Sequence, residues 1–290
     1  MSKNVLSLIA KGNYHLKNGI TTKTIFKIDK EFFENLKKEC LDLAASEAAS
    51  KVEDRDHITN WVGPFGDAVQ FSLYNTTGSY NDYSTDHNLD IKSKKFHYAE
   101  KFPTIDKFIK MFPDCTNFRL NGMGKNSGLS PHEEHIVFND QKNKSNFVRA
   151  RFHLPIMTNE KVEMLLDRKL YRYKEGEIYF FNNGAVHSAN NKGETYRFHL
   201  LWDMIMTKKA YDLMFNEEFK ETPKELKRVD FMPEVTGTFN YKTFQTYGPA
   251  KSVYEKLKLK NIGLKLESFA KLYNILKSIT SGKIDYAKEN

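Results

Sequence analysis

The chain has 290 residues, of which 40% are hydrophobic and 28% charged, and its formal net charge is +8. This length predicts one large domain or two small ones, and no apolar run reaches the roughly 18 residues that a membrane span needs. The N-terminus lacks a full signal sequence and the two cysteines are too few for a disulfide framework, so we expect a cytoplasmic protein. The positive charge is spread along the chain, which favours a basic surface over a nucleic-acid-binding tract and leaves steering of anionic substrates as a third interpretation.

The first hundred residues alternate between helix and strand patterns. Residues 29–51 carry apolar side chains at helical spacing behind Asp29, a suitable capping residue, and predict a helix. Residues 68–75 alternate with period two and predict a strand. Residues 76–96 are rich in small and polar side chains and predict a long loop of the kind that often covers a site or selects substrates. A second helix is predicted within residues 98–112.

From about residue 117 the pattern changes to short strands separated by glycines and other turn residues. The predicted strands are 118–123, 147–156, 162–166, 169–173, 178–181, 186–189 and 196–204. This rhythm is typical of an antiparallel sandwich or jelly roll.

Helical patterns return after residue 204. Residues 208–219 and 223–227 predict helices, and residues 262–279 form an amphipathic stripe. We expect that stripe to pack on the protein's own sheet rather than on a membrane surface or a partner helix. The chain thus divides, as one compact unit, into an N-terminal helical and strand portion 1–116, a β core 117–206 and a helical C-terminal extension 207–290.

Residues suited to metal binding cluster in the β core. His132 and Glu134 are two residues apart, so on an extended segment their side chains project to the same side. His187 follows a tight turn, and Arg197 comes ten residues later. Two imidazoles and one carboxylate can hold a mononuclear iron on one face and leave the other face open, and a nearby arginine can hold a dicarboxylate co-substrate. The pattern predicts an iron site fed by a 2-oxo acid.

A neighbouring histidine offers a different ligand set. His135 competes with His132, because residues 132 and 135 would share one face of a helix. The strand-like residues 136–138 favour the extended geometry and therefore His132. Each histidine, taken singly, also fits a surface or hydrogen-bonded imidazole.

Cationic side chains alternate along the strand that follows. Arg149, Arg151 and His153 share one strand face, and Arg197 and His199 repeat the pattern after the distal histidine. Such a face is costly inside a sheet unless an anion lies there, although a solvent-facing stripe is the alternative. We expect Arg149 and Arg151 to bind an anionic group of the substrate.

The segments 151–159, 176–182, 187–188 and 197–200 resemble the aspartyl/asparaginyl/prolyl hydroxylase group of Fe(II)- and 2-oxoglutarate-dependent dioxygenases. The resemblance covers roughly residues 117–204, and the ten-residue gap from the distal histidine to the arginine matches the family's usual arrangement. It implies a double-stranded β-helix core, and hence a mainly β fold of jelly-roll, cupin-like type with N-terminal helices and a helical C-terminal extension.

The resemblance also implies roles for single residues. His132 and His187 would ligate Fe(II), Glu134 would be the carboxylate ligand, Arg197 would pair with the far carboxylate of 2-oxoglutarate, and His153 would lie near its metal-bound end. The family often has Asp at the position of Glu134, and some members have no carboxylate there, so a site with only two histidines stays open.

The reaction that the resemblance implies consumes O2 and 2-oxoglutarate and hydroxylates an unactivated C–H bond. A small molecule such as an amino acid or a related carboxylate is the expected substrate, because no peptide-binding module or repeat is visible. Two alternatives stay open: a hydroxylase of a peptide or protein side chain or of nucleic acid, and a non-enzymatic cupin-like protein that binds a metal or has a regulatory role.

Overall fold

The computed structural model describes residues 2–13, 19–46, 68–129, 132, 134–140, 145–238 and 284–288. The predicted amphipathic segment 262–279 lies outside these residues. None of the helices within them is long and apolar enough to cross a lipid bilayer.

The helices are α1 (Ser2–Asn13), α2 (Lys30–Ala45), α5 (Tyr83–Asp86), α6 (Pro103–Lys110), α7 (Lys208–Phe215) and the short 3-10 helix η1 (Ile91–Ser93). The predicted cap is confirmed, because the Asp29 side chain accepts a hydrogen bond from the amide of Phe32 (3.0 Å) and so satisfies one free donor of the first turn of α2. That helix ends at Ala45, earlier than the pattern predicts. The predicted loop 76–96 contains α5 and η1.

The strands are β1 (Thr22–Ile28), β2 (Ala68–Ser72), β3 (Cys115–Met123), β4 (Ser127–Gly128), β5 (Val137–Asp140), β6 (Ser145–Met157), β7 (Val162–Leu166), β8 (Lys169–Arg172), β9 (Glu177–Phe181), β10 (His187–Asn191), β11 (Arg197–Ile205), β12 (Leu226–Phe231) and β13 (Glu234–Thr238). Every strand predicted between residues 118 and 204 is confirmed, with ends that shift by a few residues. The predicted helix at 223–227 is wrong, because β12 begins at Leu226, whose side chain is buried and whose backbone pairs with Ile28 of β1. This long-range pairing overrides the local helical pattern.

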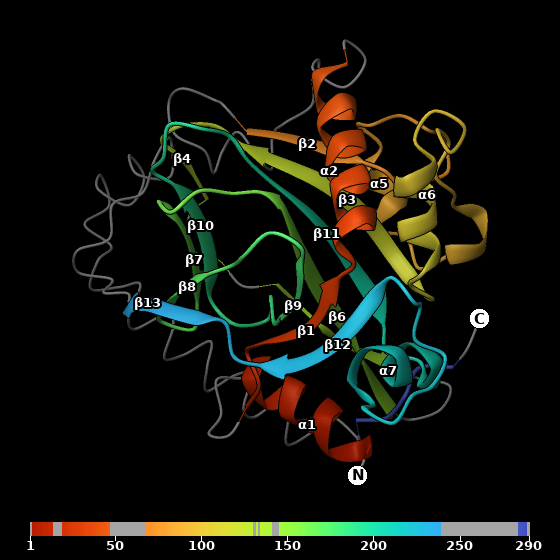
Figure 1. Cartoon of the computed structure of the whole chain (residues 1–290). Coiled ribbons are helices and arrows are strands. Elements are labelled where there is room, and N and C mark those ends of the chain that lie inside the picture. Colours follow the sequence, from red (N-terminus) through yellow and green to blue (C-terminus); the bar gives the residue numbers. More distant parts are fainter. Residues whose placement is uncertain are drawn as a thin grey trace.

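Two antiparallel sheets form the body of the protein. In the larger sheet the strand order is β12-β1-β9-β6-β11-β3-β2, with β5 paired to β6, and in the smaller sheet it is β13-β8-β7-β10-β4. Figure 1 shows the two sheets enclosing a common interior, with α2, α5 and α6 grouped on the outer side of the larger sheet. The fold is therefore mainly β, with the predicted jelly-roll character.

The two faces of β11 differ sharply in character. Trp202 faces outward into the aromatic core, where its ring stacks on Phe118 with centroids 5.1 Å apart, and this core packs against the helices. Side chains alternate along a strand, so Arg197, His199 and Asp203 lie on the opposite, inward face. The sheet thus buries its apolar face under the helices and presents a polar face to the space between the sheets.

Candidate active site

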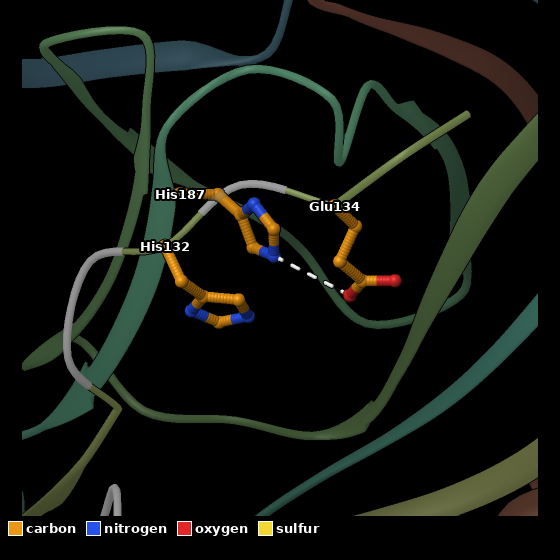
Figure 2. Close-up of side chains that lie close together, drawn as sticks. All are labelled: His132, Glu134 and His187. Atoms are coloured by element: carbon orange, nitrogen blue, oxygen red, sulfur yellow. Dashed lines mark ion pairs between the residues drawn. The ribbon is translucent and has the colours of Figure 1, made fainter. Parts of the chain in front are cut away.

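Three side chains of the kinds that bind metals meet between the sheets. The ligand-type atoms of His132, Glu134 and His187 all lie within 4.8 Å of one another, and Figure 2 shows the three side chains directed toward a common point. The arrangement has a backbone cause, since His132 and His187 pair through reciprocal amide-to-carbonyl hydrogen bonds of 3.0 and 2.9 Å. The Glu134 amide continues the pattern by donating to the Asn183 carbonyl (2.9 Å). This extended segment brings residues 132 and 134 to the same side, as their spacing predicts.

The imidazole of His187 is fixed in one orientation. Its Nδ1 lies 3.0 Å from the carbonyl oxygen of Ala185, so Nδ1 donates its proton there and Nε2 keeps its lone pair. Nε2 faces the Glu134 carboxylate at 3.8 Å. Burial, reinforced by the neighbouring His132, lowers the pKa of His187 to about 3, so the ring is neutral at physiological pH. A neutral imidazole with an oriented lone pair is the form that binds metals.

The Glu134 carboxylate is held from the opposite side. Arg151 donates to both of its oxygens, with Nη2 at 2.9 Å from Oε2, and the Asn183 amide nitrogen donates to Oε2 at 3.0 Å. Burial by itself raises the pKa of Glu134, but the Arg151 charge, the neighbouring His187 and the hydrogen bonds from Arg151 together outweigh it and hold the pKa well below its ordinary value. The group is therefore an oriented carboxylate, not a carboxylic acid.

The anion expected beside Arg149 and Arg151 is a pair of the protein's own carboxylates. Asp203, fully buried, accepts from Arg151 Nε at 2.7 Å and Nη2 at 3.0 Å, and lies 3.5 Å from Arg149 Nε. Glu134 takes the remaining Arg151 nitrogen and lies 3.8 Å from Arg149 Nη2. Sequence reasoning missed Asp203, although its period-two relation to Arg197 on β11 signalled an inward position.

Arg197 is in a different electrostatic situation. It is 2% exposed, its Nη2 contacts His199 Nδ1 (2.6 Å), and its Nε has no hydrogen-bond partner. None of the carboxylates in the described part of the chain lies within ion-pair distance of it, and burial lowers its pKa from the ordinary value of arginine to about 9. Two further buried nitrogens nearby, His153 Nδ1 and His199 Nε2, also lack partners. Buried polar atoms without partners indicate room for a polar ligand.

One cavity joins these groups. Its volume is about 300 Å³, and its lining includes the three ligand-type residues together with Arg151, His153 and Arg197. His135 lies apart: its side chain is exposed and its ring contacts Phe138, with centroids 5.5 Å apart. The geometry thus places His132, rather than His135, beside Glu134 and His187. The cavity also reaches Gln70, His87, Arg119 and Asn121, which the sequence reasoning did not single out.

Comparison with known proteins places the chain in a family. Residues 28–207 match the family model described as aspartyl/asparaginyl beta-hydroxylase. Among solved structures, the chain is similar to a viral collagen prolyl hydroxylase from Paramecium bursaria Chlorella virus-1, crystallised with 2-oxoglutarate (11% identity, 58% of this chain and 89% of that chain, TM-score 0.30). It is also similar to AviO1 from Streptomyces viridochromogenes (11% identity, 63% and 90%, TM-score 0.36) and to a 2OG-Fe(II) oxygenase family oxidoreductase from Burkholderia pseudomallei (10% identity, 47% and 66%, TM-score 0.27). At these identities and scores the family assignment rests on the family model alone.

Proposed function

Since the chain belongs to the aspartyl/asparaginyl beta-hydroxylase family, we propose that it binds Fe(II) through His132, Glu134 and His187 and hydroxylates a small molecule, an amino acid or a related carboxylate. Membership of this family identifies the chain as an oxygenase-type hydroxylase. The metal ligands, the role of each residue and the substrate class are our proposals. The observation that carries the proposal is the meeting of three ligand-type side chains with the unpaired, buried Arg197 in one cavity.

The donor set fits ferrous iron. Two imidazoles and one carboxylate, all on one side, leave the opposite side of a bound metal open, which is the arrangement of non-haem Fe(II) oxygenases. Bound Fe(II), together with 2-oxoglutarate and O2, supplies the oxidising power that an unactivated C–H bond requires. The Ala185 carbonyl sets the tautomer of His187, and Arg151 and Asn183 orient the carboxylate.

Glu134 can serve as a ligand despite its contacts with Arg151. Each carboxylate oxygen has two acceptor positions. Oε2 uses both for Arg151 and Asn183, whereas Oε1 uses one for Arg151 and keeps one, and Oε1 is the atom that faces His187. The same bonds hold the group ionised and remove its rotational freedom. We therefore propose a three-residue iron site rather than one with two histidines.

The cationic end of the cavity fits 2-oxoglutarate. A guanidinium buried without a counter-ion is energetically costly, and a carboxylate that pairs with Arg197 through two parallel hydrogen bonds removes that cost. His153 lines the same region and offers an unpartnered ring nitrogen to the other end of the co-substrate. These two residues bind and orient the co-substrate, while the surrounding Met164, Phe181 and Leu201 exclude water.

The size of the cavity favours a small substrate. A volume of about 300 Å³ lies at the lower end of the range for small-molecule sites, and the co-substrate takes up part of it. A small amino acid or carboxylate fits the remaining space better than a folded macromolecule does. Succinate release in the presence of amino acids, peptides or nucleic acid distinguishes the three classes of substrate.

The iron and 2-oxoglutarate assignments are tested by adding both to the protein under anaerobic conditions and recording the visible charge-transfer band of the chelate. The band should form with the wild-type protein and be lost in His187→Ala. His135→Ala is the matched control, because it removes an exposed imidazole outside the three-residue cluster, and it should leave the band unchanged. No band in the wild type, or an equal band in His187→Ala, contradicts the proposal.

A further inference from the structure

The cavity has a second polar end that the iron and 2-oxoglutarate assignments do not use. Gln70 of β2 and Arg119 and Asn121 of β3 line it, together with His87 from the segment after α5. Gln70 pairs in register with Asn121, and Arg119 lies two residues along the same strand, so the three side chains share the inward face. Arg119 lies four residues from Met123, the register partner of Arg197, and this is about 13 Å along the strand. The two guanidiniums are held by different partners, Arg119 by Asp86 and Arg197 by His199, so they mark separate ends of the cavity.

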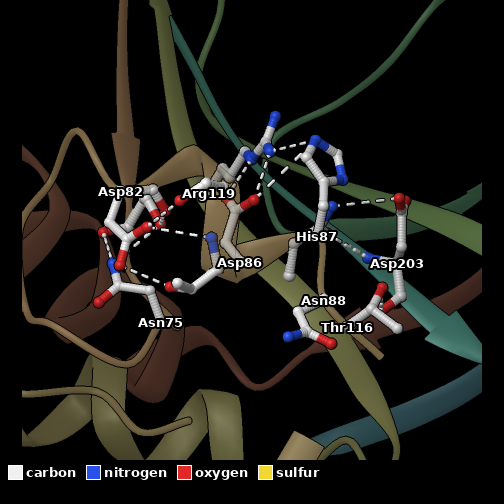
Figure 3. A network of polar contacts seen from close by, with 12 residues as sticks. Asn75, Asp82, Asp86, His87, Asn88, Thr116, Arg119 and Asp203 are labelled. Carbon is white, nitrogen blue, oxygen red and sulfur yellow. Dashed lines mark hydrogen bonds and ion pairs between the residues drawn. The ribbon is translucent and has the colours of Figure 1, made fainter. Parts of the chain in front are cut away.

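Arg119 keeps part of its guanidinium available. Its Nε and Nη2 donate to the two oxygens of the buried Asp86 at 2.6 and 2.7 Å, and Nη2 also contacts His87 Nε2 at 2.6 Å. Figure 3 shows these bonds on one edge of the guanidinium, whereas its remaining nitrogen carries no dashed line. Nη1 has no partner among the described residues. Because Arg119 lines the cavity, this nitrogen can donate two hydrogen bonds to a ligand there.

A buried lysine holds this arrangement in place. Lys94 Nζ donates to the backbone carbonyls of Asp86 (2.7 Å), Asn88 and Thr116. It thereby ties the 86–94 segment to β3, the strand that carries Arg119. The orientation of Arg119 is consequently set by the fold before any ligand binds, which lowers the entropic cost of recognition.

The charge balance of the cavity favours a substrate that presents a carboxylate. The arginines and carboxylates that line it or are ion-paired to its lining leave one positive charge in excess; they are Arg119, Arg149, Arg151, Arg197, Asp86, Glu134 and Asp203. Fe(II) and the 2-oxoglutarate dianion cancel each other, so the loaded site keeps this excess. This excess attracts the carboxylate of a substrate.

Asn121 offers a hydrogen-bond acceptor on the same face as the Nη1 donor of Arg119. The Asn121 Oδ1 atom is buried and has no hydrogen-bond partner. Its Cα lies about 7 Å from that of Arg119 on the same face, a spacing from which both side chains can reach one small molecule. The pair therefore offers a cationic donor and a neutral acceptor, which is the complement of a carboxylate next to an amino group.

Resting on the proposed function, we infer that Arg119 and Asn121 form the substrate-recognition end of the cavity and that the substrate is a free amino acid, whose carboxylate pairs with Arg119 and whose amino group donates to Asn121. This assignment moves substrate recognition away from Arg151, whose three guanidinium nitrogens all bond to Asp203 and Glu134, and from Arg149, which does not line the cavity.

The test is equilibrium binding of each of the twenty proteinogenic L-amino acids, measured by calorimetry with and without Fe(II) and 2-oxoglutarate under anaerobic conditions. At least one should bind the wild-type protein. Arg119→Gln should weaken the binding of that amino acid about tenfold to hundredfold, while the chelate band of Fe(II) and 2-oxoglutarate stays intact. The carboxamide analogue should bind wild type and variant equally weakly. Arg172→Gln, which removes an exposed arginine of β8, is the matched control and should change nothing.

Two further variants separate recognition from structure. Arg119→Gln leaves Asp86 buried without its partner, so the double variant Asp86→Asn/Arg119→Gln removes both charges together and should fold while still binding the amino acid weakly. Asn121→Ala should weaken the binding of the amino acid but not the binding of its analogue that lacks the amino group.

The outcomes distinguish the two proposals. A normal chelate band with no amino acid bound, or with binding that survives loss of Arg119 in the double variant, overturns the recognition site alone. Amino-acid binding that depends on Arg119 without any chelate band overturns the iron and 2-oxoglutarate assignment and supports the recognition site.

Discussion

Replacing Arg197 by Met should stabilise the unliganded protein and abolish tight 2-oxoglutarate binding. The aliphatic stem of Met fills much the same space as that of Arg, while the charge is removed. Burial lowers the pKa of Arg197 from its ordinary value to about 9, and at about 1.4 kcal/mol per pKa unit the charged form costs on the order of 4–5 kcal/mol in the empty cavity. Because the folded-state pKa is the lower one, this penalty is fully present below about pH 9 and declines only as the pH rises from there toward the ordinary pKa of arginine.

Part of this gain is offset. The variant loses the 2.6 Å contact with His199, about 1 kcal/mol, and water in the cavity reduces the penalty in the wild type. We expect a net gain of about 1–3 kcal/mol in the free energy of unfolding. Two charge-assisted hydrogen bonds to a carboxylate contribute about 1.5–3 kcal/mol each, so 2-oxoglutarate should bind at least about a hundredfold more weakly.

Urea unfolding of the metal-free protein and calorimetric titration of the Fe(II)-loaded protein with 2-oxoglutarate measure the two effects. Fe(II) affinity should be unchanged, because Arg197 is not among the ligand-type residues. Saturating 2-oxoglutarate should raise the stability of the wild type and not that of the variant. A variant that is less stable than the wild type and binds 2-oxoglutarate normally would refute the reasoning.

Three other substitutions test the supporting structure. Asp203→Asn should lower stability at neutral pH by about 3–5 kcal/mol. Burial alone would raise the pKa of Asp203, but Arg151 and Arg149 hold it well below its ordinary value, so the stability gap between wild type and variant in urea unfolding should begin to narrow below about pH 4 and close only as the pH falls through the lowered pKa. Lys94→Met leaves three backbone carbonyls without their donor, so hydrogen exchange should accelerate in residues 86–94 and not in the sheet core; uniform acceleration would contradict the role of Lys94. Glu134→Gln should weaken Fe(II) binding at least about a hundredfold, and Asn183→Ala, which removes only an orienting bond, about tenfold; equal losses in a metal titration would argue against ligation by Glu134.

Period-two alternation was the most informative signal in the sequence. It predicted the strands of the core and placed Arg149, Arg151 and His153 on one strand face and Arg197 and His199 on another, because alternation depends only on the local geometry of a strand. It could not show that Asp203 lies opposite Arg151, since register is set by pairing between distant segments. The arginines therefore looked available for an external anion.

The remaining differences between the sequence predictions and the structure also arise from pairing between distant segments. Leu226 begins a strand rather than a helix because Ile28, about two hundred residues earlier, offers it an edge to pair with. Arg119 and Asn121 stood on a predicted strand, but only the fold shows that β2 and β3 carry the sheet's polar face into the cavity. Spacing alone left His132 and His135 in competition, and the backbone pairing of residue 132 with His187 decides which imidazole lies beside Glu134.

The most direct test of the central claim is a crystal structure of the Fe(II)–2-oxoglutarate complex prepared under anaerobic conditions, with the metal located by anomalous scattering at the iron edge. The account predicts one iron bound by His132, Glu134 and His187, with the far carboxylate of 2-oxoglutarate on Arg197. Iron at another position, or 2-oxoglutarate bound without contact to Arg197, would contradict it.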